Sequence, residues 1–289
     1  MNQLKTAFWM VALTVLLVLT GRLLFGDVGT VGFLGLAIVM NGVAYWFSDR
    51  IALAAAKAHE VGPAEAPMLH RLADRLAIQY HVPKPRVYVS PDPSPNAFAT
   101  GRSPSHAAIC INQGLFQILD EEELYGVLAH EFAHVRNRDI LISSVVAVLA
   151  GTITLIANVA QWGLMFGGYG GRDDRDRGGA GGLVVGLLTI ILAPIAAALI
   201  QLAVSRSREY EADHTGAEVS GDPMALASAL RKLERATEVV PAQTGEPAFA
   251  HLYIVNPFRG EALARLFSTH PPIEDRIRRL EAMAAGVRR

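Results

Sequence analysis

The amino-acid sequence predicts a mainly α-helical integral membrane protein, with four transmembrane helices and a split α+β domain that carries a small β-sheet. Half of the 289 residues are apolar, which is more than a soluble domain of this size usually contains. Four stretches also lack charged residues over roughly the 20 positions that a helix needs to cross a bilayer. The polar segments combine short alternating patterns, typical of strands, with apolar residues at helical spacing.

The four apolar stretches differ in what flanks them. The first, 6–21, resumes briefly after Arg22, and the second covers 28–48. A cleaved signal peptide is the alternative for the first stretch, although no convincing cleavage site follows it. The third and fourth, 140–171 and 178–205, flank a short charged loop and predict a transmembrane hairpin. Buried core helices are the alternative there, but these runs are longer than most globular helices.

These spans divide the chain into four parts. We expect two N-terminal transmembrane helices in 1–48, a first polar segment in 49–139, the hairpin in 140–204 and a second polar segment in 205–289. Each polar segment has too few apolar residues for a core of its own, so we expect the two to pack together as one domain. The hairpin would then interrupt that domain.

Basic residues near the ends of the spans predict the orientation in the membrane. An even number of spans places both termini on the same side. Seven lysines and arginines face that side and four face the other, so the positive-inside rule places the termini and both polar segments in the cytoplasm. The larger set comprises Lys5, Arg50, Lys57, Arg136, Arg138, Arg206 and Arg208, and the smaller set Arg22, Arg172, Arg175 and Arg177.

The overall charge is close to neutral, with 26 basic and 27 acidic residues. Because no global positive field results, we expect no nucleic-acid partner. The single cysteine, Cys110, cannot form an internal disulfide, and the apolar run around it predicts a buried strand. This cysteine usage suits a reducing compartment.

A metal-binding motif lies on one predicted helix, which Asp120 and Glu123 begin with a capping box. Within it, HEFAH places His130 and His134 four residues apart, so both imidazoles project from one face and can reach one zinc ion. Glu131 is placed to act as general base for a water at the open position of such a site. The alternative is that these side chains are merely solvated or packed on an amphipathic helix. The predicted buried face of the helix comprises Leu124, Val127, Leu128 and Val135.

The second polar segment begins with a helix that carries candidates for a third zinc ligand. Glu209 and Asp213 stand four residues apart on one face, so Glu209 can bind zinc while Asp213 orients one of the histidines. Glu211 lies about 200 degrees around the helix from Glu209 and is expected to face away. His214 remains a competing ligand, because a third histidine also suits catalytic zinc. A solvated, salt-bridged helix face is the non-functional alternative.

Four segments together resemble the HtpX-type membrane zinc metalloproteases, relatives of the CAAX prenyl-protein endopeptidases: HEFAHVRNRD, SRSREYEAD, SPNAFATGR and STHPPIEDRIRRL. The resemblance covers nearly the whole chain in the family's order. It implies a zincin-like catalytic domain with a single zinc ion per chain, and the family's E-x-x-x-D pattern falls on Glu209 and Asp213. It further implies a bacterial inner-membrane protease that cuts damaged or misassembled membrane proteins from the cytoplasmic side.

A substrate-binding strand is expected before the helix that carries the HEFAH motif, called here the metal helix. The segment 96–102 lies between two predicted strands, Arg86–Ser90 and Ala107–Asn112. It could form an edge strand to which an extended substrate adds through its backbone. Asn96 begins a match to the family's N-A-F-A motif, which implies that it holds a substrate carbonyl or amide. A turn asparagine after prolines is the alternative.

The family's H-P-x-x-x-x-R pattern falls on His270 and Arg276. The resemblance implies that His270 steadies the oxyanion and that Arg276 pairs with a carboxylate behind the metal. The alternatives are a histidine that merely precedes a proline turn and an arginine on the surface of a basic helix. The segment 239–258 could form a mobile lid, although a connecting loop is the simpler interpretation.

Two other functions are compatible with these motifs. A processing protease of the CAAX type would cut one defined site rather than many. A non-catalytic scaffold would close its zinc with four protein ligands and would have no use for Glu131. Metal-assisted hydrolysis in a membrane remains the favoured interpretation, with membrane proteins or peptides as substrates and the lipid bilayer as partner.

Overall fold

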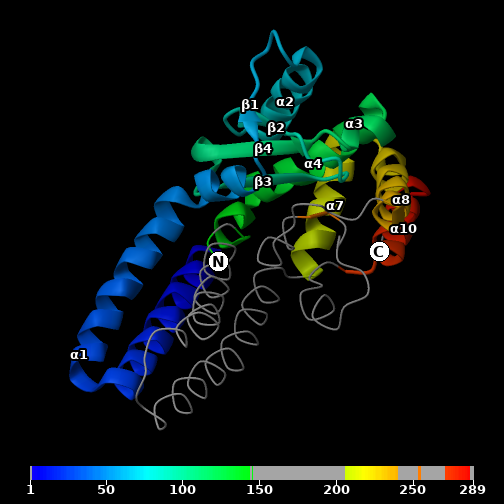
Figure 1. Cartoon of the computed structure of the whole chain (residues 1–289). Coiled ribbons are helices and arrows are strands. Elements are labelled where there is room, and N and C mark those ends of the chain that lie inside the picture. Colours follow the sequence, from blue (N-terminus) through cyan, green and yellow to red (C-terminus); the bar gives the residue numbers. More distant parts are fainter. Residues whose placement is uncertain (1, 144, 146–205, 240–252, 255–270, 287–289) are drawn as a thin grey trace.

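The structure is a computed structural model that describes residues 2–143, 145, 206–239, 253–254 and 271–286. Within them, a four-stranded mixed sheet lies between the end of a long N-terminal helix and a layer of shorter helices (Figure 1). The mostly helical fold with a small sheet agrees with the sequence-based prediction. Apart from its first few residues, the predicted hairpin lies outside the described residues, and His270 also lies outside them.

The N-terminal helix α1 (Asn2–Ala55) consists of two arms that meet at Gly26, where the backbone adopts φ 63° and ψ −142°. The arms contact one another through Asn41, whose Nδ2 donates to the Thr14 hydroxyl at 2.8 Å and to the Met10 carbonyl at 3.3 Å. In the described part of the chain, the arm Gly26–Ala55 is the one helix long and apolar enough to cross a membrane. The predicted count of four spans therefore stays a prediction.

The sheet has the strand order β1-β2-β4-β3. Its strands are β1 (His59–Glu60), β2 (Arg86–Ser90), β3 (Ala97–Gly101) and β4 (Ala107–Asn112). β4 pairs in parallel with β2 and antiparallel with β3, and β1 pairs antiparallel with β2. The bounds of β2 and β4 match the predicted strands, and β3 is an edge strand, as expected from the segment after Asn96.

The two faces of the sheet pack against different helices, because side chains alternate along each strand. On one face, Ile109 and Ile111 join the main core with α2 (Pro67–Tyr80) and the metal helix. On the other face, Cys110 and Phe98 pack with Leu53 and its neighbours at the end of α1. The sheet therefore connects the apolar N-terminal helix directly to the helix that carries the HEFAH motif.

The metal helix α4 (Glu121–Asn137) begins with the predicted capping box. The Glu123 amide donates to the Asp120 carboxylate at 2.9 Å, and the Asp120 amide donates to the Glu123 carboxylate at 3.0 Å. Lys232 of α8 (Pro223–Val239) also lies 2.6 Å from Glu123, so the buried Glu123 carboxylate is paired with a positive charge. All four residues of the predicted apolar face are buried: Leu124, Val127, Leu128 and Val135.

Three helices from the second polar segment complete the core around α4: α7 (Arg206–Ser220), α8 (Pro223–Val239) and α10 (Ile273–Ala284). Two short helical turns, η1 (Pro104–His106) and α3 (Leu115–Ile118), flank β4. α7 approaches α4 very closely at Gly216, where a Cβ atom would lie 3.0 Å from the His130 backbone nitrogen. A glycine at this position therefore brings the two helices that carry the site together.

Candidate active site and metal centre

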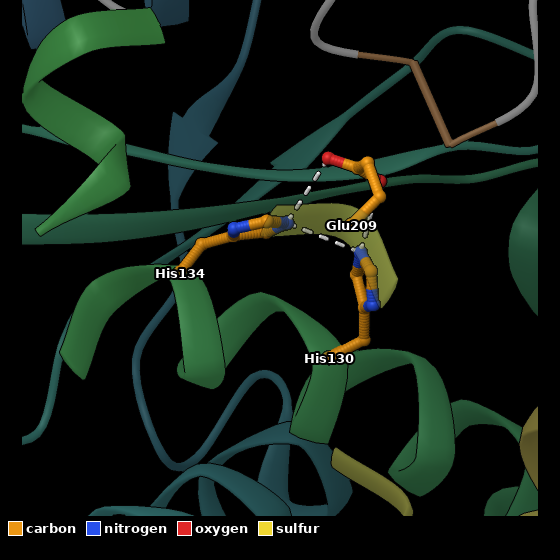
Figure 2. Close-up of side chains that lie close together, drawn as sticks. All are labelled: His130, His134 and Glu209. Carbon is orange, nitrogen blue, oxygen red and sulfur yellow. Dashed lines mark hydrogen bonds and ion pairs between the residues drawn. The ribbon is translucent and has the colours of Figure 1, made fainter. Parts of the chain in front are cut away.

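Three side chains from two helices converge on one point (Figure 2). The Nε2 atoms of His130 and His134 lie 3.2 Å apart. The Glu209 carboxylate lies 3.7 Å from His130 Nε2 and 3.5 Å from His134 Nε2. Glu209 follows His134 by 75 positions and His130 by 79 in the sequence, yet α7 places its carboxylate beside the two imidazoles of α4.

This donor set fits a zinc ion. Zinc commonly takes imidazole nitrogens and a carboxylate oxygen, and one ligand atom from each of these three residues lies within 4.8 Å of the others. The Nδ1 atom of each histidine contacts a carboxylate instead of the shared point. His130 Nδ1 lies 2.9 Å from Asp213, and His134 Nδ1 lies 3.1 Å from Asp139. Both Nε2 atoms are therefore left to face the shared point, as in other histidine metal sites.

Asp213 is fixed by the guanidinium of Arg276, which donates two hydrogen bonds of 2.7 and 2.6 Å to it. Burial alone would raise the pKa of Asp213, but the Arg276 charge and the hydrogen bonds with Arg276 and His130 together outweigh burial and lower the pKa to about 2. Arg276 is fully buried, so the alternative of a surface arginine is wrong. The structure thus brings Asp213 and Arg276 together behind His130.

Asp139 holds a corresponding place behind His134, and the sequence analysis missed it. It is buried, and its other oxygen lies 3.7 Å from the guanidinium of Arg208 on α7. The chain reaches it through Arg138, which has a left-handed conformation just after α4. The position of Asp139 in the sequence could have indicated this contact. An acidic residue beside a helix C-terminus is unfavourable unless a positive or hydrogen-bonding group pairs with it.

The pKa of His134 reflects this acidic environment. Burial lowers it, but the Asp139 hydrogen bond and the charges of Glu209 and Glu131 together outweigh burial and raise the pKa to about 9. The site is therefore strongly negative around the two imidazoles, which favours a bound cation.

Glu131 is buried beside the two histidines, and its Oε2 atom accepts a 2.8 Å hydrogen bond from the Ala99 amide of β3. Burial raises the pKa of this carboxyl group, while the charges of His130 and His134 oppose the rise. A carboxylate with a raised pKa next to a metal site can accept and return a proton. The same hydrogen bond joins the edge strand β3 to the metal helix α4.

The other candidate residues named from the sequence lie outside the cluster of His130, His134 and Glu209. Asn96 is buried at the start of β3, and its Oδ1 atom accepts a 3.0 Å hydrogen bond from the Ile254 amide. Ile254 is one of the few described residues of the segment 239–258. His214, the competing ligand, is exposed and lies 3.4 Å from Glu218 rather than beside the metal residues. Glu211 is exposed, as expected from its position on the helix.

Two histidines on one helix, a carboxylate from a second helix and a buried glutamate between them define a metallopeptidase site. The sequence profile of peptidase family M48 matches residues 63–284, and the chain belongs to this family. It is accordingly a metallopeptidase, and the resemblance noted from its motifs is confirmed.

Similar proteins cover the chain almost completely. A protease HtpX homolog of Pyrococcus furiosus is 53% identical over 280 residues, which are 97% of this chain and 95% of the relative. Another, from Syntrophobacter fumaroxidans, is 50% identical over 282 residues, covering 98% and 99% of the two chains. Among solved structures, S. mikatae Ste24p is similar in fold, with a TM-score of 0.50 and 18% identity. The match covers 96% of this chain and 64% of Ste24p.

Proposed function

We propose that this chain is a membrane-embedded zinc endopeptidase that hydrolyses peptide bonds of membrane proteins, with Glu131 as general base. The observation that carries the proposal is the position of Glu131, buried between the pair of metal-ligating histidines and the backbone of an edge strand. An edge strand beside a proton acceptor provides a place where an extended peptide can add and be cut.

His130, His134 and Glu209 would hold the zinc ion, which leaves a coordination position for water. A zinc ion bound there would polarise the scissile carbonyl and lower the pKa of its bound water toward about 7. Asp213 and Asp139 contact the Nδ1 atoms and keep both imidazoles turned toward the ion. Arg276 neutralises Asp213 and so keeps that carboxylate in place.

Glu131 takes the proton from the attacking water and then passes it to the nitrogen of the leaving amine. Its raised pKa suits both steps, because a base with a pKa nearer neutrality both accepts and releases the proton readily. His270, outside the described residues, is proposed to stabilise the negative oxygen of the tetrahedral intermediate. Donors in this role typically contribute about 100-fold or more to the rate.

The substrate is proposed to add to β3 as a further strand. β3 is an edge of the sheet, and the Ala99 amide points from it toward Glu131 rather than toward β4. Asn96, at the start of β3, is proposed to hold a backbone group of the substrate. Because strand addition pairs backbone with backbone, this mode suits many unrelated sequences. Damaged or misassembled membrane proteins are therefore the proposed substrates, and cleavage at one carboxy-terminal site would instead indicate a processing protease.

The membrane setting is proposed from α1 and from the apolar stretches of the sequence. The arm Gly26–Ala55 has 30 residues, which is more than a helix needs to cross a bilayer. We place the chain in the inner membrane with four spans, and with both termini and the metal site in the cytoplasm. This placement rests on the distribution of lysine and arginine near the span ends.

The test of the proposed function is the variant Glu131→Gln in detergent-solubilised protein. It removes the proton acceptor but keeps the size of the side chain, so zinc content should stay unchanged. Casein cleavage should fall by about 100-fold or more, the usual contribution of a general base. The matched control is Glu211→Gln, an exposed glutamate that should behave as wild type. Undiminished cleavage by Glu131→Gln would contradict the proposal.

A further inference from the structure

The second arm of α1, Gly26–Ala55, exposes large apolar side chains along its length as far as Phe47. No other large hydrophobic side chain is exposed between positions 48 and 77, a stretch that the structure describes completely. The exposed apolar side chains of the arm include Val28, Val31, Ile38, Val39, Trp46 and Phe47. A face of this kind suits hydrocarbon, so its end marks the level at which the helix leaves the bilayer.

Two guanidinium groups lie over aromatic rings at that level. Arg50 lies 5.6 Å from the centre of the Phe47 ring, and Arg102 lies 4.9 Å from the centre of the Trp46 ring. Arg102 does not belong to α1 but directly follows β3. The nearby acidic side chain, Asp49, is paired with Arg86 at 2.8 Å, so its charge is compensated locally. Arginines held over aromatic rings suit the phosphates of lipid headgroups, and the amphipathic indole of Trp46 suits the interface itself.

We propose that Trp46, Arg50 and Arg102 form an anchor that binds phospholipid headgroups and holds the edge strand β3 at the surface of the bilayer. The inference rests on the proposed membrane setting and deepens it, because it specifies which part of a substrate reaches the metal site. The partner is the headgroup layer, recognised by guanidinium–phosphate contacts and by an indole ring at the interface.

The anchor is rigidly linked to the site. Ala52 and Leu53, which follow the anchor on α1, pack with Phe98 of β3 and Cys110 of β4. In Figure 1 the sheet correspondingly lies across the end of α1. Helix and sheet are therefore held together by a buried apolar cluster rather than by a loop, so the height of β3 above the membrane is fixed.

The distance from the anchor to the catalytic base follows from strand geometry. Ala99, whose amide contacts Glu131, precedes Arg102 by three residues, or about 10 Å of extended chain. Because the sheet lies across the end of α1, this distance runs along the bilayer surface, and a polypeptide that leaves the bilayer reaches the level of β3 after only a few extended residues. The substrate class is therefore the segment just outside a transmembrane helix, and cuts should fall within about 10 residues of the membrane boundary.

The depth of Trp46 gives the first test. The sequence has three tryptophans, so Trp9→Phe with Trp162→Phe leaves Trp46 as the sole indole. In nanodiscs that contain anionic phospholipid, lipids brominated near the headgroup should quench its fluorescence more strongly than lipids brominated near the bilayer centre. If the protein inserts but lipids brominated near the bilayer centre quench Trp46 equally or more strongly, the proposed anchor is wrong and the membrane setting stands. Failure to enter nanodiscs overturns the membrane setting as well.

The second test uses a substrate with one transmembrane helix and a long tail of identical repeats. Wild type in nanodiscs should cut near the membrane boundary, as mapped by mass spectrometry of the products. The variant Arg50→Gln with Arg102→Gln should spread its cuts along the tail while still cleaving soluble casein. The exposed Arg71→Gln on α2, which pairs with Glu121, is the control and should keep the wild-type pattern.

A conservative variant separates loss of the anchor from loss of folding. Arg50→Lys with Arg102→Lys keeps both charges and should keep cuts near the boundary, even where the glutamine variant loses casein cleavage through misfolding. Cuts spread along the tail by the wild type, or by a lysine variant that still cleaves casein, overturn the proposal.

Discussion

Each histidine of the candidate metal site contacts a carboxylate through its Nδ1 atom, and each carboxylate lies near an arginine from another part of the chain. Asp213 contacts His130 and pairs with Arg276, while Asp139 contacts His134 and lies near Arg208. A buried carboxylate is costly unless it is paired, so these arginines allow acidic groups to lie beside the imidazoles. The orientation of the two Nε2 atoms therefore depends on residues that do not touch the metal.

Asp139→Ala tests this dependence. The variant removes the group that contacts His134 Nδ1, so zinc affinity should fall by about 10–100-fold, the usual effect of losing such a partner. Zinc affinity is measured by competition with a chromogenic chelator, and circular dichroism of the metal-free protein checks folding. The exposed Glu211→Ala is the control. Wild-type affinity in a folded Asp139→Ala protein would show that Asp139 does not position the ligand.

Cys110 gives a pH-dependent prediction. Burial raises the pKa of its thiol from the ordinary 9.0 to about 12. Between these values the unfolded chain loses the thiol proton and the folded chain keeps it, so this thiol lowers stability as pH rises above 9.0 and not below it. At pH 9, iodoacetamide should therefore modify denatured protein rapidly and native protein hardly at all. Ser105→Cys places a thiol at an exposed position and should react in both states. Rapid modification of native Cys110 would contradict its burial.

Sequence analysis predicted some of these residues and missed others for physical reasons. Glu209 and Asp213 were predicted because helical spacing places them on one face and the family's E-x-x-x-D pattern falls on them. Asp139 was missed because its contact depends on the left-handed turn at Arg138, which no local pattern records. Arg276 was predicted only through the resemblance to the family, because the pattern of a charged helix does not say which of its arginines turns inward.

At the scale of elements, the site depends on how closely α7 lies against α4. Gly216 faces the backbone of His130, and the absence of a side chain there allows Glu209, two turns earlier, to reach the histidines. The capping box at Asp120 and the strand bounds were predicted because they follow from local chemistry. The contact between Asn96 and Ile254 was not, because it joins residues far apart in the sequence.

Gly216→Val tests the close approach of the two helices. The added side chain would overlap the backbone of α4, since even a Cβ atom lies 3.0 Å from the His130 nitrogen. We expect a loss of about 1–3 kcal/mol in the free energy of unfolding, typical of overpacking, together with weaker zinc binding. Glu211→Val adds the same β-branched residue to an exposed position of α7 and is the control. Equal stability and zinc affinity in the two variants would rule out a tight contact.

At the scale of the whole molecule, two polar segments separated by a long apolar interruption build one core. α4 from the first segment packs with α7 and α8 from the second, and the sheet joins this unit to α1. Sequence patterns predicted a small sheet beside a metal helix, but not the strand order, because strand pairing depends on contacts that local sequence does not encode. The candidate metal site lies where the two segments meet, so its assembly requires both.

The central claim is that His130, His134 and Glu209 share one zinc ion that keeps a position for water. The most direct test is zinc content together with zinc X-ray absorption on purified wild-type, Glu209→Ala and Glu211→Ala proteins. We predict that wild type and Glu211→Ala bind stoichiometric zinc with two imidazoles at about 2.0–2.1 Å, while Glu209→Ala loses the ion. Zinc retained at full occupancy by Glu209→Ala, or enclosed by four protein ligands in the wild type, would contradict the account.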